Sequence, residues 1–360
     1  MELMKRLNLQ MFADAGTVVN ATGHIANAYT GETTANNGAF DSTMKTYYET
    51  EMLENARPER IYAQFAMKQP LPANHGETVE WRKWNTFEPA TQLVEGVIPT
   101  GQRFGQTKIL ASIDQYGTYT ALSDRLDTRA YDPVILGASQ EMGASFAATE
   151  EWLIKGGLLT GTNVLYCDNV DADGTVTGTT PTAANQMGAS ATNGFAYLTG
   201  DMVAKAATTL KKMKAPRIDG RYVAVVHPSV AEDLRKSKGW LAPHEYAQPS
   251  EIFSGEIGEL HGVRFVENPD APVLADEYEN KDGGVTYATY FFGKEGFAII
   301  DPAEGGMELI VKDKGQIGGP LEQFSTVGYK FETNGATILY PERVLRVMST
   351  SSYSATDEAN

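Results

Sequence analysis

The sequence predicts an α+β fold, and three observations lead to that prediction. Residues 132–155 carry apolar side chains at helical spacing, the segments 78–87 and 107–122 alternate in polarity as strands do, and from Tyr222 onward short apolar runs alternate with a helical segment. The chain has 360 residues, which at about 100–200 residues per domain corresponds to two domains, or to one domain with extensions. Hydrophobic residues make up 42% of the chain, enough to bury a sizeable core.

The charge and the cysteine content exclude several classes of protein. The chain has 46 Asp and Glu against 30 Lys and Arg, a net charge of -16, which argues against a general nucleic-acid binder. The longest unbroken apolar run is five residues, Tyr222–Val226, too short to span a membrane. The single cysteine, Cys167, rules out an intrachain disulfide framework and fits a reducing cytoplasm.

Both ends of the chain are expected to extend from the compact part. The first 13 residues include apolar ones, but Asn8 and Gln10 interrupt them, so no export signal is predicted. Residues 14–39 are small and polar, which predicts an extended arm that is either disordered or laces subunits together. The polar segment Ser349–Asn360 is expected to be a frayed tail.

The first predicted helix follows the arm. Asp41 is a suitable cap, and Met44, Tyr48 and Met52 recur at four-residue steps. The helix is expected to end before Pro58, because the residue before a proline is driven out of the helical conformation.

A long hairpin is predicted next, with Thr78–Phe87 and Thr107–Leu122 as its strands. In the first strand the alternation fails at Lys83-Trp84, which predicts a bulge or a twist. The connection, Glu88–Gln106, is 19 residues long, and a structureless loop of that length is uncommon inside a compact domain. Either the strand assignments are wrong, or the hairpin projects from the body and lies on a partner.

The clearest helix begins at Asp132-Pro133, since Asp is a favoured cap and Pro is favoured in the first helical position. It is expected to end after Lys155, at Gly156-Gly157. A helix of this length, about 36 Å, would act as a strut across a broad, flat body.

The rest of the chain is expected to be loops and weak strands over 160–198, followed by an α/β segment. Asp201–Lys214 is predicted to be a helix, and Ser229 and Glu232 have the spacing of a capping box that starts another. Turns are expected at His261-Gly262 and Asp301-Pro302. The predicted strands are Tyr222–Val226, Val263–Glu267, Thr286–Phe292, Phe297–Ile300, Met307–Val311, Tyr329–Tyr340 and Val344–Val347.

No constellation of residues predicts catalysis, a cofactor site or a metal site. The five histidines are not paired at a metal-ligand spacing, and His227 is expected to be structural. The Gly-x-Ser sequences lack the last glycine of a nucleophile elbow. Asn169–Gly174 resembles the start of a calcium loop, but Asn169 and Thr180 stand at the first and twelfth places, so a turn is favoured. Cys167 is expected in a polar loop and stays unassigned.

One cluster interleaves aromatic and basic residues and forms the candidate site of inter-subunit contact. It consists of Trp81, Arg82, Lys83 and Trp84, with Phe87 just beyond. Such residues can stack on nucleic acid bases, or they can pack on protein. We favour protein contact, because Trp and Arg are enriched at interface hot spots, and a second copy of the chain is the simplest partner.

Four segments carry a resemblance to a known family through their order along the chain. They are Leu7–Ala13 (LNLQMFA), Tyr116–Asp124 (YGTYTALSD), Val225–Ser229 (VVHPS) and Ile257–Phe265 (IGELHGVRF). Together with the predicted elements, they resemble tailed-phage major capsid proteins of the HK97-like fold, and most of all the N4-like phage capsid family. None of the four is a catalytic motif.

The resemblance implies an HK97-like division of the chain. The E-loop hairpin would lie over a neighbouring subunit, the long helix would be the spine of the peripheral domain, and the axial α/β domains would meet at hexamer and pentamer centres. The implied parts are an N-terminal arm (1–40), a peripheral domain (41–65, 126–198 and 325–350), the E-loop hairpin (66–125), the axial domain (199–324) and a tail (351–360).

The resemblance also implies a function. The chain would be a major capsid protein that self-assembles into the icosahedral shell enclosing the phage double-stranded DNA genome, in the virion, after assembly in the host bacterial cytoplasm. Its implied partners are copies of itself as hexamers and pentamers, a separate scaffolding protein, a portal protein and decoration proteins, with no membrane and no sequence-specific DNA binding. The alternatives are an encapsulin-like protein compartment and a cytosolic α/β enzyme.

Overall fold

The structure is a computed structural model, and part of the chain is described by it. The described residues are 19–20, 25–26, 33–34, 60–72, 76–93, 95–96, 98, 100–123, 125–126, 134–171, 175–237, 256–302, 306–312, 316 and 323–360. Most of the expected arm, the helix predicted between Asp41 and Pro58, and the cap at Asp132-Pro133 lie outside these residues.

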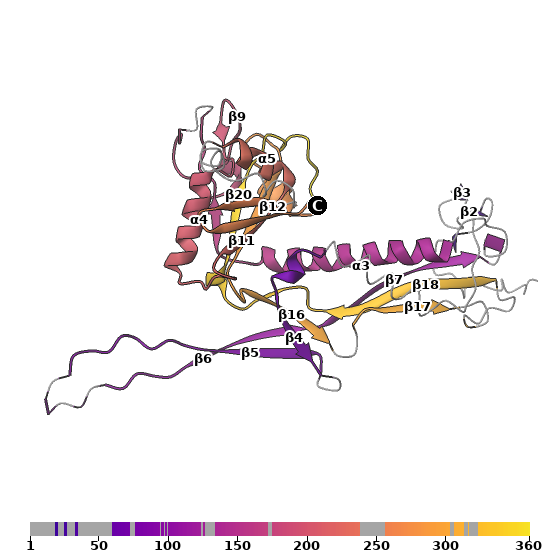
Figure 1. The fold of residues 1–360 in the computed structure, drawn as a ribbon, viewed down its shortest axis with the longest axis horizontal. Helices are drawn as coiled ribbons and strands as arrows, with labels where there is room; N and C mark the ends of the chain where they lie inside the picture. The colour runs from indigo at the N-terminus through magenta and orange to yellow at the C-terminus, as the bar shows by residue number, and fades with distance from the viewer. Residues whose placement is uncertain are drawn as a thin grey trace, which may run out of the picture.

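A seven-stranded mixed sheet forms the centre of an α/β body (Figure 1). Buried residues of α4 (Gly200–Lys212) and α5 (Pro228–Lys236) join the same core as the strands. The strand order is β12 (Glu256–Leu260), β13 (Val263–Glu267), β11 (Tyr222–Val226), β15 (Thr286–Phe292), β20 (Val344–Ser349) and β8 (Val164–Tyr166), with β14 (Val273–Leu274) beside β15. The predicted bounds of β11, β13 and β15 are confirmed. β11 and β15 are buried at every position, as strands covered on both faces are, whereas β13 exposes Arg264.

The long helix α3 (Val134–Leu159) lies along a second sheet (Figure 1). With 26 residues it spans about 39 Å. Phe146 packs edge-on against Phe331, with 4.8 Å between the ring centroids, and this contact helps to hold the helix on the sheet. The strand order of the sheet is β1 (Val19–Asn20), β7 (Asp114–Ser123), β18 (Phe324–Thr333) and β17 (Glu308–Lys312).

A three-stranded sheet and a hairpin complete the main architecture. The sheet consists of β19 (Thr337–Ile338), β16 (Phe297–Pro302) and β4 (Met67–Leu71). The hairpin, β5 (Thr78–Trp84) and β6 (Gln106–Ser112), projects away from both bodies, as the length of its connection predicted (Figure 1). The smaller elements are β2 (Ile25–Ala26), β3 (Thr33–Thr34), β9 (Ala189–Ser190), β10 (Gly194–Phe195) and the 3-10 helices η4 (Tyr62–Gln64), η5 (Ala184–Gln186), η7 (Asp276–Tyr278) and η9 (Pro341–Arg343).

The predicted strand Thr107–Leu122 is two strands. The chain leaves the hairpin at Ile113, and β7 then pairs with β18 in another sheet. In the sequence, Tyr119 and Ala121 continue the odd-numbered apolar positions of Ile109, Ala111 and Ile113, so the pattern gave no sign of the change of partner, although Tyr119 is 59% exposed in β7. The predicted bulge at Lys83-Trp84 is also wrong, since the register of β5 with β6 is regular from Thr78 to Trp84.

Two other predicted boundaries are wrong for a common reason, which is that tertiary packing outweighs a local stop signal. Helix α3 runs through Gly156-Gly157, and a Cβ at Gly157 would lie 2.3 Å from the carbonyl oxygen of Ala336, so this glycine permits a close approach. The turn expected at Asp301-Pro302 is the end of β16, where Asp301 pairs with Pro70 of β4.

The cap of α5 differs from the predicted capping box. The imidazole Nδ1 of His227 accepts a hydrogen bond from the Ser229 backbone N–H at 3.2 Å, so His227 is the cap. The Ser229 hydroxyl instead donates to Asp357 Oδ2 at 2.6 Å. The structural role expected for His227 is thus confirmed.

The segment predicted to be a frayed tail is packed against α5. The carboxylate of Asp233 accepts hydrogen bonds from the hydroxyl groups of Ser351 and Ser352, at 2.6 and 2.8 Å, and from the Ser352 backbone N–H at 2.8 Å. The side chain of Asn360 accepts a bond from the Val273 backbone N–H at 3.2 Å. The polar composition of this segment led to the prediction of a frayed tail. The composition alone does not show that the Asp233 carboxylate accepts hydrogen bonds from these serines.

Sheet membership links segments that the sequence division separates. The strands β8 and β20 fall in stretches that the resemblance assigns to the peripheral domain, yet both lie in the seven-stranded sheet with β11, β13 and β15. The strand β17 falls in the stretch assigned to the axial domain, yet it pairs with β18 beside α3. Among the described residues, no helix is long and apolar enough to cross a membrane.

Candidate assembly interface

The stem of the hairpin has two different faces because side chains alternate along each strand. Val79, Trp81 and Lys83 are half-buried, whereas Glu80, Arg82 and Trp84 point to the exposed side. On the exposed side Glu80 forms ion pairs with Arg82 and, across the ladder, with Lys108 at 3.3 Å. The Arg82 guanidinium, helped by Lys108, holds the pKa of Glu80 below its usual value.

The half-buried face connects the hairpin to the body of the same chain. Lys83 Nζ lies 3.2 Å from the carboxylate of Glu342 in η9 and 4.7 Å from the ring centroid of Tyr340. Arg343 covers the same ring, with 3.7 Å from its guanidinium carbon to the centroid. Lys83, predicted as an inter-subunit contact, is therefore engaged within the subunit and helps to set the direction of the hairpin.

Three aromatic rings form a stack on the exposed part of the hairpin. Trp84 stacks on Phe104 with 4.3 Å between ring centroids and 12° between planes, and Phe104 stacks on Phe87 at 5.3 Å and 17°. The three residues are 54–58% exposed. We call Trp84, Phe87 and Phe104 the aromatic stack. Stacked rings that stay this exposed present a rigid apolar surface of the kind that fills interface hot spots.

Hydrogen bonds extend the hairpin beyond its regular strands. The Asn85 backbone N–H donates to the Gly105 carbonyl at 3.0 Å. Gln102 bridges the two sides with its amide, accepting from the Glu88 N–H at 2.9 Å and donating to the Glu88 carbonyl at 3.1 Å. These bonds order the base of the long connection and support the rings between them.

Sequence reasoning identified two of the three rings of the aromatic stack and missed Phe104. It also missed Leu110, which is 66% exposed on β6 opposite Glu80. The signal was present in the register, since a regular ladder that pairs Trp84 with Gln106 places Phe104 near Trp84 and Phe87. Because Glu88–Gln106 was interpreted as a loop, the position of Phe104 beside Trp84 was not predicted.

Other residues considered from the sequence have no part in this interface. Cys167 is wholly buried in the core, which corrects the expected polar loop, and burial raises the pKa of its thiol. Asp171 Oδ1 accepts from the Thr175 N–H at 2.8 Å, as in a turn. Within the described part of the chain, no group of three or more His, Cys, Asp and Glu side chains could hold a metal ion.

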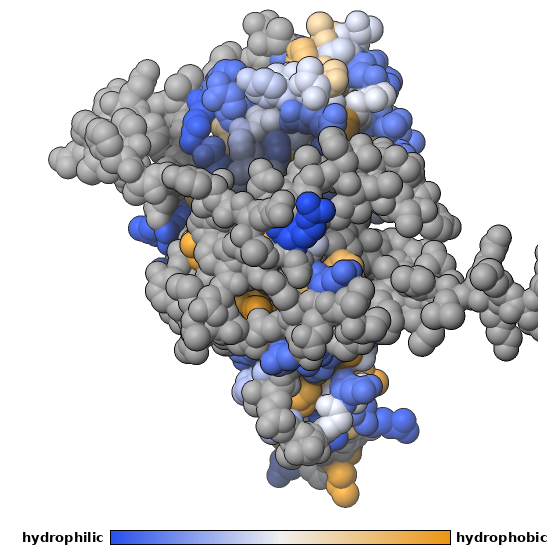
Figure 2. All heavy atoms as spheres, turned by 90° about the vertical axis from the view of Figure 1, so that its right-hand side faces the viewer, coloured by the Kyte–Doolittle hydropathy of each residue, from blue (hydrophilic) through white to orange (hydrophobic). Residues whose placement is uncertain are grey.

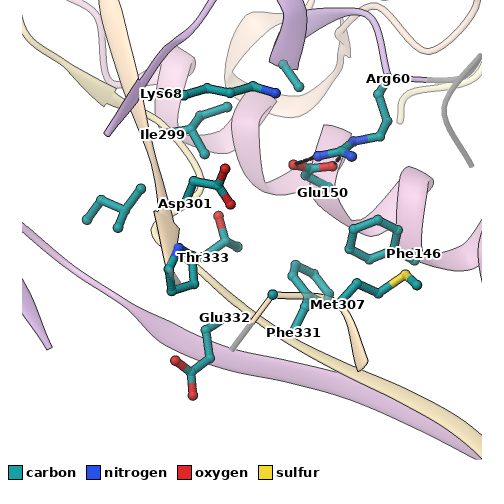
Figure 3. A pocket seen from close by; sticks show the side chains of 14 residues that line it. Arg60, Lys68, Phe146, Glu150, Ile299, Asp301, Met307, Phe331, Glu332 and Thr333 are labelled. Carbon is teal, nitrogen blue, oxygen red and sulfur yellow. Dashed lines mark hydrogen bonds and ion pairs between the residues drawn. The ribbon is translucent and has the colours of Figure 1, made fainter. Parts of the chain in front are cut away.

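A cavity of about 230 Å³ lies between α3, β16 and β18 (Figure 3). On one side Glu150 of α3 is paired with Arg60, whose guanidinium carbon lies 5.4 Å from the ring centroid of Phe146. Phe331 and Met307 form another side, and the carboxylate of Asp301 faces them from β16 (Figure 3). The ion pair holds Arg60, two residues before η4, on the long helix, so the contact is a structural one.

The face of the molecule seen in Figure 2 differs from the hairpin in how its hydrophobic residues are distributed. Its coloured residues are largely hydrophilic, with hydrophobic ones scattered among them (Figure 2). Scattered apolar residues of this kind are normal on a protein surface. The aromatic stack of the hairpin is a more concentrated apolar feature than any that the coloured residues of this face show (Figure 2).

The chain combines a long helix on a sheet, an α/β body and a projecting hairpin with exposed aromatic rings. Three solved structures share the fold: the capsid asymmetric unit of cyanophage Pam1 (13% identity, TM-score 0.60, covering 92% of this chain and 98% of that one), the capsid of cyanophage P-SCSP1u (14%, 0.56, 81% and 89%) and the capsid of Ralstonia phage GP4 (14%, 0.54, 91% and 97%). The fold is thus HK97-like, as predicted.

The sequence itself identifies the family. A family model described as phage capsid protein matches residues 106–339, more than half of the chain, and the chain belongs to this family. No match was found among curated proteins. As a shell-forming phage capsid protein, the chain is a structural component of the virion.

Proposed function

We propose that copies of this chain assemble as hexamers and pentamers into an icosahedral shell that encloses the double-stranded DNA genome of a tailed phage. Membership of the phage capsid protein family supports the role, and the aromatic stack on the projecting hairpin is the observation that carries the mechanism. Apolar rings held away from their own subunit become buried only when a neighbouring copy covers them.

The hairpin, in this proposal, lies over a neighbouring copy and buries Trp84, Phe87 and Phe104 there. Arg82 and Glu80 lie beside the rings and would form the polar rim of the contact. Trp81 and Lys83 act from the other face, where Lys83 is held by Glu342. Contacts that are weak singly become strong when they are repeated over a closed shell.

Each part of the chain is proposed to have its own role in the shell. The α/β body, in which β8 and β20 join strands of the stretch 199–324, would meet its copies at the centres of hexamers and pentamers, and α3 would brace the peripheral part, which includes β17. The net charge of -16 suits a container, since a wall need not bind the DNA tightly. A scaffolding protein, a portal protein and decoration proteins would be its partners, and assembly would take place in the host cytoplasm before the virion is complete.

Electron microscopy of the purified full chain tests this proposal. We expect closed shells with icosahedral symmetry, and particles from infected cells that contain double-stranded DNA resistant to nuclease. A chain that stays monomeric under all assembly conditions would contradict shell formation. Shells that contain cargo proteins instead of DNA would identify a protein compartment.

A further inference from the structure

Positive charge is concentrated at one end of the α/β body, although the chain as a whole is acidic. The end of α4 and the loop after it, residues 211–217, carry exposed cations at four of seven positions. Lys294 lies beside them, because its backbone N–H donates to the Pro216 carbonyl at 2.9 Å. We call these cations the basic patch: Lys211, Lys212, Lys214, Arg217 and Lys294. Within the described part of the chain, no carboxylate lies within ion-pair distance of the first four.

Hydrogen bonds hold the loop of the basic patch in one shape. The Tyr222 hydroxyl donates to the Ala215 carbonyl at 2.9 Å. Ile218 and Arg221 exchange two backbone bonds, at 2.8 and 2.9 Å. The Arg217 guanidinium carbon lies 5.7 Å from the ring centroid of Tyr222. A patch that is ordered in advance loses less conformational entropy on binding than flexible surface lysines lose.

The opposite end of the same body is acidic. Asp276, Glu277 and Glu279 lie in and just after η7, and all three are exposed. We call these three residues the acidic patch. Among the residues that the structure describes, no cation is within ion-pair distance of them. The Thr286 hydroxyl donates to the Tyr278 carbonyl at 2.7 Å, which fixes the acidic patch at the start of β15.

The strand β15 separates the two patches. It begins beside the acidic patch and ends at Phe292, two residues before Lys294. Its seven residues span about 20 Å, so the patches cannot pair within one chain. Figure 1 shows α4 at one edge of the α/β body and the C-terminus at the opposite edge. The C-terminal Asn360 donates from its N–H to the Val273 carbonyl, just before η7, at 3.1 Å.

Opposite charges at opposite ends suit a head-to-tail contact between copies. When the basic patch of one copy meets the acidic patch of the next, one patch of each kind stays free at the two ends of the row. Further copies can then be added until the row closes into a ring. An antiparallel pair would instead use all four patches at once and stop at two copies.

We propose that the basic patch of each copy faces the acidic patch of the next copy around every hexamer and pentamer. The inference rests on the proposed shell function, because a ring needs a head-to-tail contact at each subunit. Complementary charges fix the orientation of the copies and speed their encounter. The net charge of -16 makes copies that meet in other orientations repel each other.

Carbodiimide cross-linking of assembled shells of the parent chain tests this contact, because the reagent joins a lysine amine to a carboxylate only where the two touch. We expect peptides that contain 211–214 or Lys294 to be linked to peptides that contain 276–279. Such links must join two copies, since the patches lie too far apart within one chain. On denaturing gels the linked chains should form ladders that continue beyond two copies.

Unassembled chains are the control and should give at least about tenfold less of these linked peptides. Shells that form other cross-links but none between the two patches would overturn the proposal. Ladders that stop at two copies would indicate an antiparallel pair and would also overturn it.

Charge reversal tests the complementarity. The double variant Lys211→Glu, Lys212→Glu and the double variant Glu277→Lys, Glu279→Lys should each raise the concentration needed for assembly at least about tenfold. Their folding should be nearly unchanged, because all four side chains are exposed. The matched control combines the four substitutions. It keeps the net charge of the parent and should assemble within about threefold of the parent's concentration.

The outcomes distinguish this inference from the proposed function. A parent chain that forms no shells contradicts the proposed function and the inference with it. A parent that assembles while the combined variant stays as defective as the double variants overturns only the pairing of the patches. If reversal of the basic patch leaves assembly unchanged and lowers only the DNA retained in the shells, the patch faces DNA and the inference is overturned.

Discussion

Glu151 is a carboxyl group buried where α3 meets η4. Its side chain is 2% exposed, and Oε1 accepts a hydrogen bond from the Tyr62 backbone N–H. Burial raises the pKa of Glu151 to about 7, because the charged form loses its hydration. At the pH of most experiments the residue is close to its midpoint, and its protonation is coupled to the stability of the joint between the helix and η4.

The raised pKa predicts how stability depends on pH. Between about 4.5 and 7 the folded chain keeps a proton on Glu151 that the unfolded chain has released, so the free energy of unfolding falls as pH rises through this window. The loss attributable to this one group is about 3 kcal/mol. Urea unfolding at several pH values should show it, and Glu151→Gln should largely remove this slope while keeping the bond to Tyr62.

Glu141→Gln is the matched control, since it removes an exposed carboxylate from the same helix. It should leave the pH profile of the parent unchanged. If Glu151→Gln keeps the full slope, the coupling between burial and protonation at this position is refuted.

Gly157 shows a steric constraint that one methyl group can test. A Cβ there would lie 2.3 Å from the Ala336 carbonyl oxygen, whereas a Cβ at Gly156 would meet nothing within 4 Å. Gly157→Ala should therefore lower the free energy of unfolding by about 1–3 kcal/mol, as overpacking does. Gly156→Ala should raise it by about 0.5–1 kcal/mol, as removal of a helical glycine does. Denaturant unfolding of both variants measures the two effects, and equal changes would contradict a close approach at Gly157.

At the scale of elements, the C-terminal segment is held by a carboxylate on α5. Asp233 is 8% exposed and accepts three hydrogen bonds from Ser351 and Ser352. Asp233→Ala removes the acceptor of the Ser352 hydroxyl and N–H and leaves the Ser351 hydroxyl only the Ser229 carbonyl, so it should lower the free energy of unfolding by about 3 kcal/mol. Hydrogen exchange should show the amides of 350–357 losing protection.

The neighbouring residue supplies the control for that prediction. Glu232 is paired with Lys236 at the surface, at 3.0 Å, and Glu232→Ala should change neither the unfolding free energy nor the exchange of the tail appreciably. Unchanged protection of 350–357 in Asp233→Ala would show that other contacts hold this segment.

The elements that sequence reasoning predicted well are those whose signals are local. The apolar run of β11 and the helical spacing of α3 each depend on residues next to one another in the chain. The change of strand partner at Ile113 and the hydrogen bond from Ser351 to Asp233 both depend on residues far away in the sequence. An alternation pattern states which side a residue faces, and it does not state which strand lies beside it.

The hairpin residues show the same limit, which is that a local sequence pattern does not reveal distant contacts. Trp84 and Phe87 were found because they follow a strand with an aromatic and basic cluster, whereas Phe104 lies in what looks like a glycine-rich loop. Lys83 was assigned to the interface from its neighbours, because nothing local indicates that Glu342 lies 3.2 Å from it.

At the scale of the whole molecule, assembly should depend on the aromatic stack more than folding does. Trp84 and Phe104 are both 58% exposed, so the double variant Trp84→Ser, Phe104→Ser should unfold at nearly the same denaturant concentration as the parent. The concentration needed for shells should rise at least about tenfold, measured by light scattering and microscopy. Val176→Ser, which removes another 58% exposed apolar side chain, from the α/β body, should assemble normally. Unimpaired assembly of the double variant would mean that the hairpin rings are not buried between neighbours.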